Sequence, residues 1–288
     1  MQTLIEGYQL LDSGEGRKLE QFGERIIDRP SSLCSWKCRE DTSLWSTADA
    51  RYDNEKGWSH TSQTSKIWQA SIQGTALALE LLSNGQVGLF PEHAMYLPEV
   101  AQTIARLRGD TDRTIRVLNL FAYSGLATSF CAKLPHVHVT HVDLSKRAIE
   151  WAKRNVDLNS IAGDRVRWIL DDALGFMSRE SRKSQVYDIV IIDPPSFSRL
   201  SKKNSWTLDE KAAEIANLVL SVVDHSRFAI YFTNHSSAST SDVIRNISLD
   251  AIESHNLQFA TRSLAITESS STRRLPAGAL IMLSMGLT

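Results

Sequence analysis

From about residue 110 onward, short apolar runs alternate with segments whose apolar residues recur at helical spacing. The runs that predict strands are Ile115–Leu120, Val137–Asp143, Val166–Leu170, Asp188–Asp193 and Phe228–Thr233. The segments that predict helices lie near 125–133, 145–158, 172–180, 208–223 and 240–255. Such alternation is typical of a mostly parallel sheet with helices on both faces. The chain ends differently, because Phe259–Ile266 and Ala279–Ser284 predict an antiparallel hairpin.

The first ninety or so residues follow another pattern. Tyr8–Asp12 and Lys18–Phe22 read as short strands joined by a glycine-rich turn, and Asn84-Gly85 between apolar runs predicts a hairpin of 72–82 with 86–90. Leu97–Arg108 fits a helix. We therefore expect a small, mostly antiparallel β-rich domain at residues 1–92 and an α/β domain at residues 93–288.

Four of the seven tryptophans lie in this N-terminal region: Trp36, Trp45, Trp58 and Trp68. Large indoles there are more often core or interface residues than a platform on which bases stack. We therefore expect them to pack within the domain.

The composition excludes some partners. The chain has 288 residues and a formal net charge of -1, so no global field draws it to nucleic acid or membrane, and any RNA contact must be local. No signal peptide and no membrane-length apolar run is visible. Three cysteines favour a reducing, cytoplasmic location without disulfides. Cys34 and Cys38 lack a matching second pair, so no metal site is expected.

One strand end carries an unusual sequence. The apolar run Ile189–Ile192 leads into Asp193, and Pro194 and Pro195 follow at once. Proline cannot donate to a strand ladder and restricts the residue before it, so the strand must stop in a stiff loop. Open α/β sheets bind ligands at such carboxyl ends. The loop presents an acid, bare carbonyls and the Phe197 ring, although an ordinary proline turn would look the same.

A second motif, Asn119–Gly125, follows the first predicted strand and opens a helix. Gly125 permits close approach of the backbone to a ligand, and the helix N-terminus suits a carboxylate. A dinucleotide fingerprint needs three glycines in this turn, and only one is present. The segment therefore favours a smaller nucleoside ligand over a pyrophosphate.

Acids follow the next two strands. Asp143 lies eighteen residues after Gly125, close to the ~20 residues at which a ribose-binding acid follows a glycine-rich turn. A carboxylate suits a ribose because it accepts two hydroxyl hydrogens. Asp172 borders the following helix and could accept an adenine amino hydrogen. For both acids, a residue that merely stabilises a helix start is the alternative.

Together these segments resemble the motifs of class I S-adenosylmethionine-dependent methyltransferases. The residues that carry the resemblance are Leu118–Gly125, Val142–Lys146, Asp171–Ala173 and Asp193–Phe197. Their order is specific for the family, and the resemblance covers residues 110–288. It implies a Rossmann-like methyltransferase sheet with S-adenosyl-L-methionine as cofactor. The residues implied to bind the cofactor are Phe90, Glu92, Asn119, Phe121, Tyr123, Gly125, Asp143, Leu144, Asp172, Ala173 and Asp193.

Within the family, the chain resembles ribosomal RNA methyltransferases of the large subunit, which act on guanine N7 or on cytosine C5. Cytosine C5 is a poor nucleophile and needs a cysteine thiolate that first adds to the ring. No cysteine lies after Cys131, and Thr233-Asn234 resembles the guanine-N7 type instead. We therefore expect direct in-line transfer to a base nitrogen of rRNA, without a covalent intermediate.

The resemblance also implies an acceptor site. Its residues are Asp193, Pro194, Pro195, Phe197 and Asn234. Phe197 would stack on the base while Asp193 and the Pro194 carbonyl hold its amino edge, and guanine N7 needs no general base because it carries no proton. The basic residues that follow, Arg199, Lys202 and Lys203, are candidates for RNA phosphates, although a solvated basic loop is equally consistent.

Two other functions stay open. A methyltransferase that acts on a small molecule or a protein would carry the same cofactor motifs. A nicotinamide dehydrogenase is opposed by the missing glycines, and a non-catalytic nucleoside-binding module is opposed by Asp193-Pro-Pro. The sequence does not name the target nucleotide or the oligomeric state.

Overall fold

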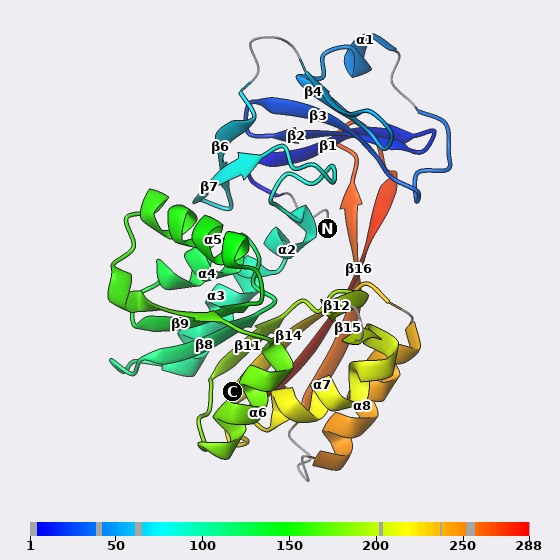
Figure 1. Cartoon of the computed structure of the whole chain (residues 1–288). Coiled ribbons are helices and arrows are strands. Elements are labelled where there is room, and N and C mark those ends of the chain that lie inside the picture. The colour runs from blue at the N-terminus through cyan, green and yellow to red at the C-terminus, as the bar shows by residue number, and fades with distance from the viewer. Residues whose placement is uncertain are drawn as a thin grey trace. The chain divides into compact units, whose positions relative to one another are not determined.

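The computed structural model describes residues 5–38, 42–60, 65–201, 204–236, 238–251 and 257–287. The chain forms two compact units (Figure 1). The first comprises Met1–Leu97 and Leu264–Ala277, and the second comprises Pro98–Ser263 and Gly278–Thr288. Residues 264–277, which the sequence placed in the second domain, thus belong to the first unit. A boundary between two domains at residues 92 and 93 stays a prediction.

The second unit contains a seven-stranded sheet in the order β10-β9-β8-β11-β14-β16-β15. Its strands are β8 Ile115–Leu120, β9 Val137–Asp143, β10 Val166–Leu170, β11 Ile189–Ile192, β14 Phe228–Asn234, β15 Gln258–Thr267 and β16 Arg274–Met285. The first five are parallel, and β16 pairs antiparallel with β14. The predicted mixed α/β sheet with a closing hairpin is confirmed.

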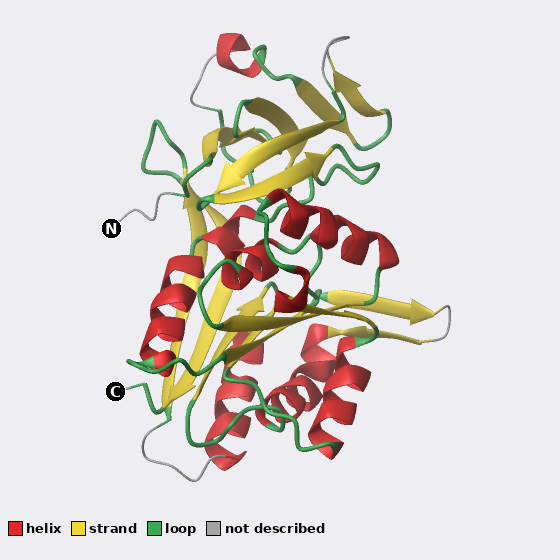
Figure 2. Ribbon diagram, turned by 90° about the vertical axis from the view of Figure 1, so that its left-hand side faces the viewer, coloured by secondary structure: helices red, strands yellow, loops and turns green. Residues whose placement is uncertain are grey.

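Helices cover both faces of this sheet (Figure 2). They are α3 Leu97–Arg108, α4 Leu126–Ala132, α5 Lys146–Leu158, the short 3-10 helix η1 Gly163–Arg165, α6 Ala173–Arg182, α7 Leu208–Leu220 and α8 Ala238–Ala251. One face carries α6, α7 and α8, and the other carries α3, α4 and α5 (Figure 1). All four residues of β11 are buried, as expected for a strand covered on both faces.

One element of this unit was not predicted. The loop after Pro195 contains a hairpin of β12 Phe197–Ser201 with β13 Asn204–Thr207, in which Phe197 pairs with Thr207. No alternation of apolar and polar residues marks these two strands in the sequence. The last residues of the predicted helix at 240–255 lie outside the described residues, which end for α8 at Ala251.

The first unit is rich in β-structure. Its five-stranded sheet runs in the order β1-β2-β3-β4-β5, and a separate hairpin pairs β6 with β7. The strands are β1 Tyr8–Gly14, β2 Arg17–Phe22, β3 Arg25–Pro30, β4 Ala50–Asp53, β5 Gly57–His60, β6 Ile67–Ile72 and β7 Thr75–Glu80, with short helices α1 Thr42–Trp45 and α2 Pro91–Ala94. Among the strand pairs described for this unit, β3 with β4 is parallel and the others are antiparallel, and Leu10 of β1 makes one isolated parallel bridge to Glu268. The mostly antiparallel character is confirmed.

The prediction of a hairpin around Asn84-Gly85 is wrong, because the two strands expected on either side of this turn do not form as predicted. The strand expected at 72–82 is interrupted by a turn at Gln73-Gly74, which joins β6 to β7. The chain does reverse at Gly85, where the Leu82 amide donates to the Gln86 carbonyl at 2.9 Å. The Glu80 amide also donates to the Val87 carbonyl at 3.1 Å, but residues 86–90 form no strand.

The four N-terminal tryptophans are half-buried, and each indole N–H is satisfied within the first unit. The acceptors are the Ser13 carbonyl for Trp36, Asp12 for Trp45, the Leu82 carbonyl for Trp58 and the Phe22 carbonyl for Trp68. Because their polar edges are occupied inside the unit, these residues act as packing residues, as expected.

Candidate active site

The strand register of the second unit brings the predicted acids to one edge of the sheet. Ile192 of β11 lies opposite Leu120 of β8 on one side and Phe232 of β14 on the other. On β9, Val142 lies opposite Leu120 and Asp143 opposite Leu170 of β10. The residues that follow these strands therefore share one edge, as the carboxyl ends of parallel strands must.

The loop after β8 holds an unusual backbone conformation. Phe121 and Tyr123 have φ values of +52° and +49°, and Gly125 has +81°. Residues other than glycine rarely adopt positive φ values, and strained loops of this kind cluster at functional sites. Gly125 also has no room for a side chain, because a Cβ atom would lie 2.7 Å from the Ala152 Cβ of α5. The sharp turn thus lets α4 pack directly on α5.

Asp143 is fixed by two loops. One carboxylate oxygen accepts the Tyr123 amide and the other accepts the Ser145 amide, each at 2.8 Å. Burial raises the pKa of the Asp143 carboxyl, and the two backbone N–H groups partly offset that rise. Each carboxylate oxygen can accept more than one hydrogen bond. The Asp143 side chain is therefore held in a defined position with acceptor capacity left for a pair of hydroxyl groups.

The next strand end holds Asp172 as the N-cap of α6. Its carboxylate accepts the Gly175 amide at 2.8 Å, which is the helix-start role considered from the sequence. The neighbouring Asp171 pairs with Arg179, and Ala173 is buried. Leu144, directly after Asp143, is 53% exposed. Leu144 thus places an uncovered apolar side chain beside an acid that is ready to bind hydroxyl groups.

Asp193 is held by side chains of the adjacent strand end. Its Oδ1 contacts the Thr233 hydroxyl and lies 3.2 Å from Nε2 of His235. The Ser196 hydroxyl donates to the His235 carbonyl at 3.2 Å, which ties the loop after β11 to the end of β14. His235 was not predicted as a site residue, since its contact with Asp193 depends on strand pairing.

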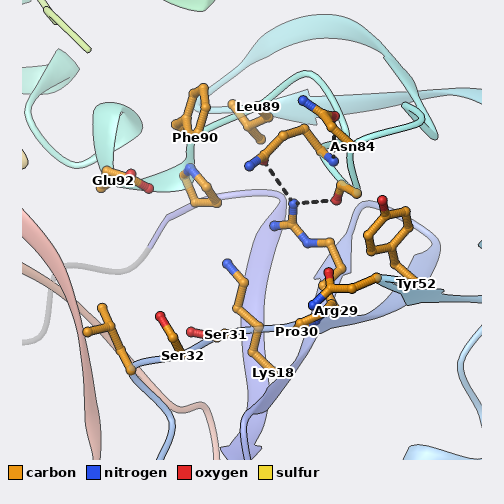
Figure 3. A pocket seen from close by; sticks show the side chains of 15 residues that line it. Lys18, Arg29, Pro30, Ser31, Ser32, Tyr52, Asn84, Leu89, Phe90 and Glu92 are labelled. Carbon is orange, nitrogen blue, oxygen red and sulfur yellow. Dashed lines mark hydrogen bonds between the residues drawn. The ribbon is translucent and has the colours of Figure 1, made fainter. Parts of the chain in front are cut away.

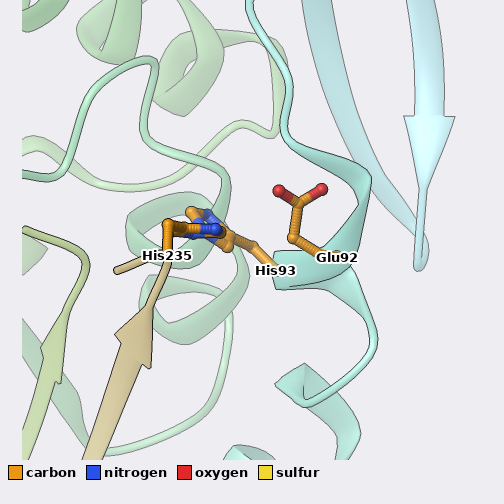
Figure 4. A group of neighbouring side chains, drawn as sticks. All are labelled: Glu92, His93 and His235. Atoms are coloured by element: carbon orange, nitrogen blue, oxygen red, sulfur yellow. The ribbon is translucent and has the colours of Figure 1, made fainter. Parts of the chain in front are cut away.

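The His235 ring packs against the backbone of Gly278. A Cβ atom on Gly278 would lie 2.7 Å from Nδ1 of His235, and Gly278 has a φ of +96°. A glycine at this position of β16 therefore leaves the space that the imidazole occupies. His235 itself lies at the end of β14 (Figure 4).

The remaining predicted acceptor residues differ in exposure. Pro194 is buried, whereas Pro195 is exposed and Phe197 is 58% exposed at the start of β12. Asn234 is 3% exposed, and its side-chain oxygen accepts the Ser236 amide at 2.8 Å. Phe197 thus offers an uncovered ring, while the Asn234 amide shapes the loop after β14.

Asn119 lies beneath the edge rather than on its surface. It is 4% exposed, and its amide donates to the Thr128 hydroxyl of α4 at 2.9 Å. That hydroxyl lies 2.8 Å from Nδ1 of the fully buried His141. Burial lowers the pKa of His141 to about 3, so the ring is neutral. This polar chain joins β8, α4 and β9 under the strained loop.

Two predicted cofactor residues belong to the first unit. Phe90 precedes α2, where its ring lies 5.8 Å from the His93 ring, and Glu92 is 8% exposed within α2 (Figure 4). The predicted phosphate contacts are not placed by the structure. Lys202 and Lys203 lie outside the described residues, and Arg199 is described only through its backbone, which pairs with Ser205 in β13.

The edge of the second unit therefore combines a strained single-glycine turn, an anchored acid, an exposed leucine and a second acid in a proline loop. This set fits a nucleoside with a ribose and a base, and it lacks the glycines of a pyrophosphate cradle. The fold and the site define a nucleoside-binding α/β enzyme of the methyltransferase type.

A family model described as S-adenosylmethionine-dependent methyltransferase matches residues 18–212, which is more than half of the chain. The chain belongs to this family, and its cofactor is S-adenosyl-L-methionine. A nucleoside, as predicted from the strand ends, is part of that cofactor.

Curated relatives carry ribosomal names. The chain is 35% identical over 147 residues to "Ribosomal RNA large subunit methyltransferase K/L" of Allochromatium vinosum, covering 51% of this chain and 19% of that protein. It is 31% identical over 162 residues to "Ribosomal RNA large subunit methyltransferase K" of Neisseria meningitidis, covering 55% and 43%. The chain thus spans less than half the length of these relatives.

A solved structure matches almost the whole chain. It is a SAM-dependent methyltransferase from Agrobacterium tumefaciens, 28% identical, with a TM-score of 0.86. The match covers 98% of this chain and 91% of that chain. The similarity therefore extends over the β-rich first unit as well as over the methyltransferase sheet.

Proposed function

We propose that this protein methylates a base nitrogen of ribosomal RNA, of the guanine-N7 type, by direct in-line transfer. The observation that carries the proposal is the loop Asp193–Phe197, which presents an anchored acid and a ring that is 58% exposed beside the strand ends of the cofactor site. The names of the curated relatives support RNA as the acceptor. We also keep the cytoplasm as its proposed location, since all three cysteines are free thiols.

The cofactor side is assigned to the ends of β8, β9 and β10. Asp143 binds the ribose hydroxyls, Leu144 covers one face of the adenine, and Asp172 accepts its amino hydrogen. The turn from Phe121 through Tyr123 to Gly125 lies against the methionine part, and Asn119 fixes that turn through Thr128. Ala173 lies at the start of α6. Phe90 and Glu92 of the first unit stay predicted cofactor residues. When bound, S-adenosylmethionine supplies an electrophilic methyl group.

The acceptor side is assigned to the proline loop. Phe197 stacks on the target base, and such stacking contributes about 1–3 kcal/mol per base. Asp193 and the Pro194 carbonyl accept hydrogen bonds from the amino edge, while Pro195 keeps the loop stiff and Asn234 fixes the adjoining strand end. Holding the nucleophile in line is the main source of rate in such a transfer.

No covalent step through cysteine is needed in this proposal. Cys131 is fully buried, which raises its pKa to about 12, and burial also raises the pKa of Cys34 and of Cys38. Thiols held protonated in this way are poor nucleophiles. The assignment to a base nitrogen, which carries its own lone pair, is consistent with such inert thiols.

The position of Phe197 gives the test. Phe197→Ala should lower the rate of methyl transfer to an rRNA fragment and leave cofactor affinity nearly unchanged, because the ring touches the base only. Leu249→Ala, which removes another exposed apolar side chain from α8, serves as the control. Equal turnover by the Phe197 variant and the wild-type protein would remove the loop from the acceptor site.

The phosphate contacts proposed for Arg199, Lys202 and Lys203 need a separate test. Neutralising all three should weaken the salt dependence of RNA binding. The slope of log affinity against log salt concentration should become smaller by about 0.7–0.9 for each lost phosphate contact. The second candidate function is a methyltransferase acting on a small molecule or protein. It would gain support if the wild-type protein bound no RNA at low salt.

A further inference from the structure

The first unit contains a pocket of about 360 Å³ whose lining includes none of the strand-end motifs of the second unit, although it includes Phe90 and Glu92, two predicted cofactor residues (Figure 3). This volume falls within the ~300–1,000 Å³ typical of small-ligand sites. Its lining includes Lys18 of β2, Arg29 of β3, Ser31, Ser32 and the α2 residue Glu92. All fifteen lining residues belong to the first unit, so the pocket is a property of that unit alone.

A buried charge cluster adjoins this pocket through Lys18 and Arg29 of the lining. Glu20, which is fully buried, accepts the Tyr8 hydroxyl at 2.9 Å and Nε of Arg29 at 2.8 Å. The other end of the Arg29 guanidinium donates to the Gly85 carbonyl at 3.3 Å and to the Gln86 side chain at 3.2 Å. Arg29 therefore neutralises Glu20 and has its own donors satisfied.

Lys18 is the second cation beside Glu20, and Glu92 of the lining is the other acid that acts on its charge. Its ammonium lies 3.1 Å from Glu20, and its side chain is only 20% exposed. Glu20 is its one hydrogen-bond partner in the described part of the chain, whereas an ammonium carries three donors. Burial lowers the Lys18 pKa, with Glu20 opposing that change. Burying a cation is costly unless it is fully paired, so Lys18 gains most from a further anion.

The view in Figure 3 shows Lys18 reaching into the pocket between Arg29 and the Ser31-Ser32 pair. Hydroxyl groups can donate to an anion that Lys18 holds by charge. Gln86 uses its side-chain oxygen for Arg29, which leaves its NH2 group as a further donor in the lining. Glu92 is the acid of the lining and disfavours anions there.

We propose that this pocket binds a phosphate group of the RNA substrate, with Lys18 as the charged contact and Ser32 and Gln86 as further donors. The choice of RNA as the source of the phosphate rests on the proposed function. A free mononucleotide offers the same chemistry, and an acidic protein segment would offer carboxylates instead.

The first experiment uses the unmodified chain of 288 residues. The lysine side-chain signals are followed by NMR while inorganic phosphate is added, with acetate as the comparison anion. The Lys18 signal should shift and saturate with phosphate, whereas Lys56, which is exposed in the turn before β5, should not respond. A Lys18 signal that stays unchanged, or that responds equally to acetate, would overturn the proposal.

Two substitutions should then move phosphate affinity in opposite directions. Lys18→Met should weaken phosphate binding at least tenfold because the charged contact is lost. Glu92→Gln should strengthen it because a like charge is removed, and Lys56→Met should change nothing. If Lys18→Met fails to fold, the phosphate affinity of Glu92→Gln and the titration of the wild-type protein still test the proposed phosphate site. Unchanged affinity in Glu92→Gln together with a silent Lys18 signal would contradict the assignment.

The source of the phosphate is tested with a structured rRNA fragment. Lys18→Met should lower the slope of log affinity against log salt by about 0.7–0.9, the value for one lost phosphate contact. Competition by a mononucleotide but no change in this slope would overturn RNA as the source. Methyl transfer to RNA is measured separately. If the protein methylates RNA but the pocket binds no phosphate, only this inference is refuted. If the pocket binds phosphate but RNA is not methylated, only the proposed function is refuted.

Discussion

The two acids at the edge of the methyltransferase sheet are held in different ways. Asp143, on the proposed cofactor side, is fixed by the backbone amides of Tyr123 and Ser145. Asp193, on the proposed acceptor side, is fixed by the side chains of Thr233 and His235. Backbone anchors depend on the loop conformation and not on the identity of the residue that donates. The position of the Asp143 carboxylate therefore depends on the backbone fold. The position of the Asp193 carboxylate depends on particular side chains, so single substitutions can change it.

The largest effect is expected where the fold itself anchors the cofactor side. Gly125→Val should destabilise the chain by about 3 kcal/mol, because a left-handed non-glycine residue and an overpacked contact each cost roughly 1–3 kcal/mol. The Cβ would lie 2.7 Å from the Ala152 Cβ at a φ of +81°. Denaturant unfolding measures the loss. Gly163→Ala is the matched control, since nothing lies within 4 Å of its Cβ position.

A wild-type unfolding midpoint in Gly125→Val would show that the strained turn is not what holds the cofactor side together.

Removing the anchored acid should act on binding more than on stability. Asp143→Ala should cost at least about 1.5 kcal/mol of S-adenosylmethionine affinity, since hydrogen bonds to charged groups contribute roughly 1.5–3 kcal/mol. Isothermal titration of the cofactor measures this change, and Asp157→Ala on the exposed side of α5 is the control. Full affinity in the Asp143 variant would exclude it from the site.

The buried His141 under the cofactor turn predicts a pH dependence of stability. Its pKa of about 3 in the folded chain lies below the ~6.5 of an unfolded histidine, so acid protonates the unfolded chain first. The stabilisation is complete above pH ~6.5 and is lost as the pH falls toward 3. Unfolding free energies should drop by about 2 kcal/mol between pH 7 and pH 5 through this residue.

His141→Gln should remove that part of the pH dependence, whereas His138→Gln, on the same strand but partly exposed, should keep it. Identical pH profiles for His141→Gln and the wild-type protein would show that another group is responsible.

The smallest effect is expected on the acceptor side. His235→Ala should lower kcat by up to about tenfold, since a single hydrogen bond contributes roughly 0.5–1.5 kcal/mol, and His235→Gln should recover part of it. Cofactor affinity should be equal in all three proteins, because His235 acts by positioning Asp193. A parallel loss of cofactor affinity would instead place His235 on the cofactor side.

The sequence predicted the parallel sheet well because its strands are rich in apolar and β-branched residues, and the central strands β11 and β14 are buried throughout. Three expected strands, Ile115–Leu120, Val137–Asp143 and Val166–Leu170, have the bounds that the structure shows. Short amphipathic strands were missed, such as β3 Arg25–Pro30, whose charged residues are neutralised only by partners distant in the chain. Local patterns do not contain such pairings.

The site residues that could be predicted are those that follow apolar strands along the chain. Asp143 and Asp193 follow clear apolar runs, so their places at the strand ends could be read from the chain. The role of His235 depends on β11 pairing with β14 and on the space left by Gly278 of β16, three segments far apart in sequence. The pocket around Lys18 likewise depends on residues from β2, β3 and the loop before α2.

The central claim, methylation of a base nitrogen in rRNA, is tested most directly on its product. The purified chain is incubated with rRNA from cells that lack the gene and with isotopically labelled S-adenosylmethionine, and the nucleosides are then analysed by mass spectrometry. The account predicts one labelled methyl group on a base nitrogen, as in 7-methylguanosine. Label in 5-methylcytidine, or none in RNA while the same protein methylates a small molecule or a protein, would contradict it.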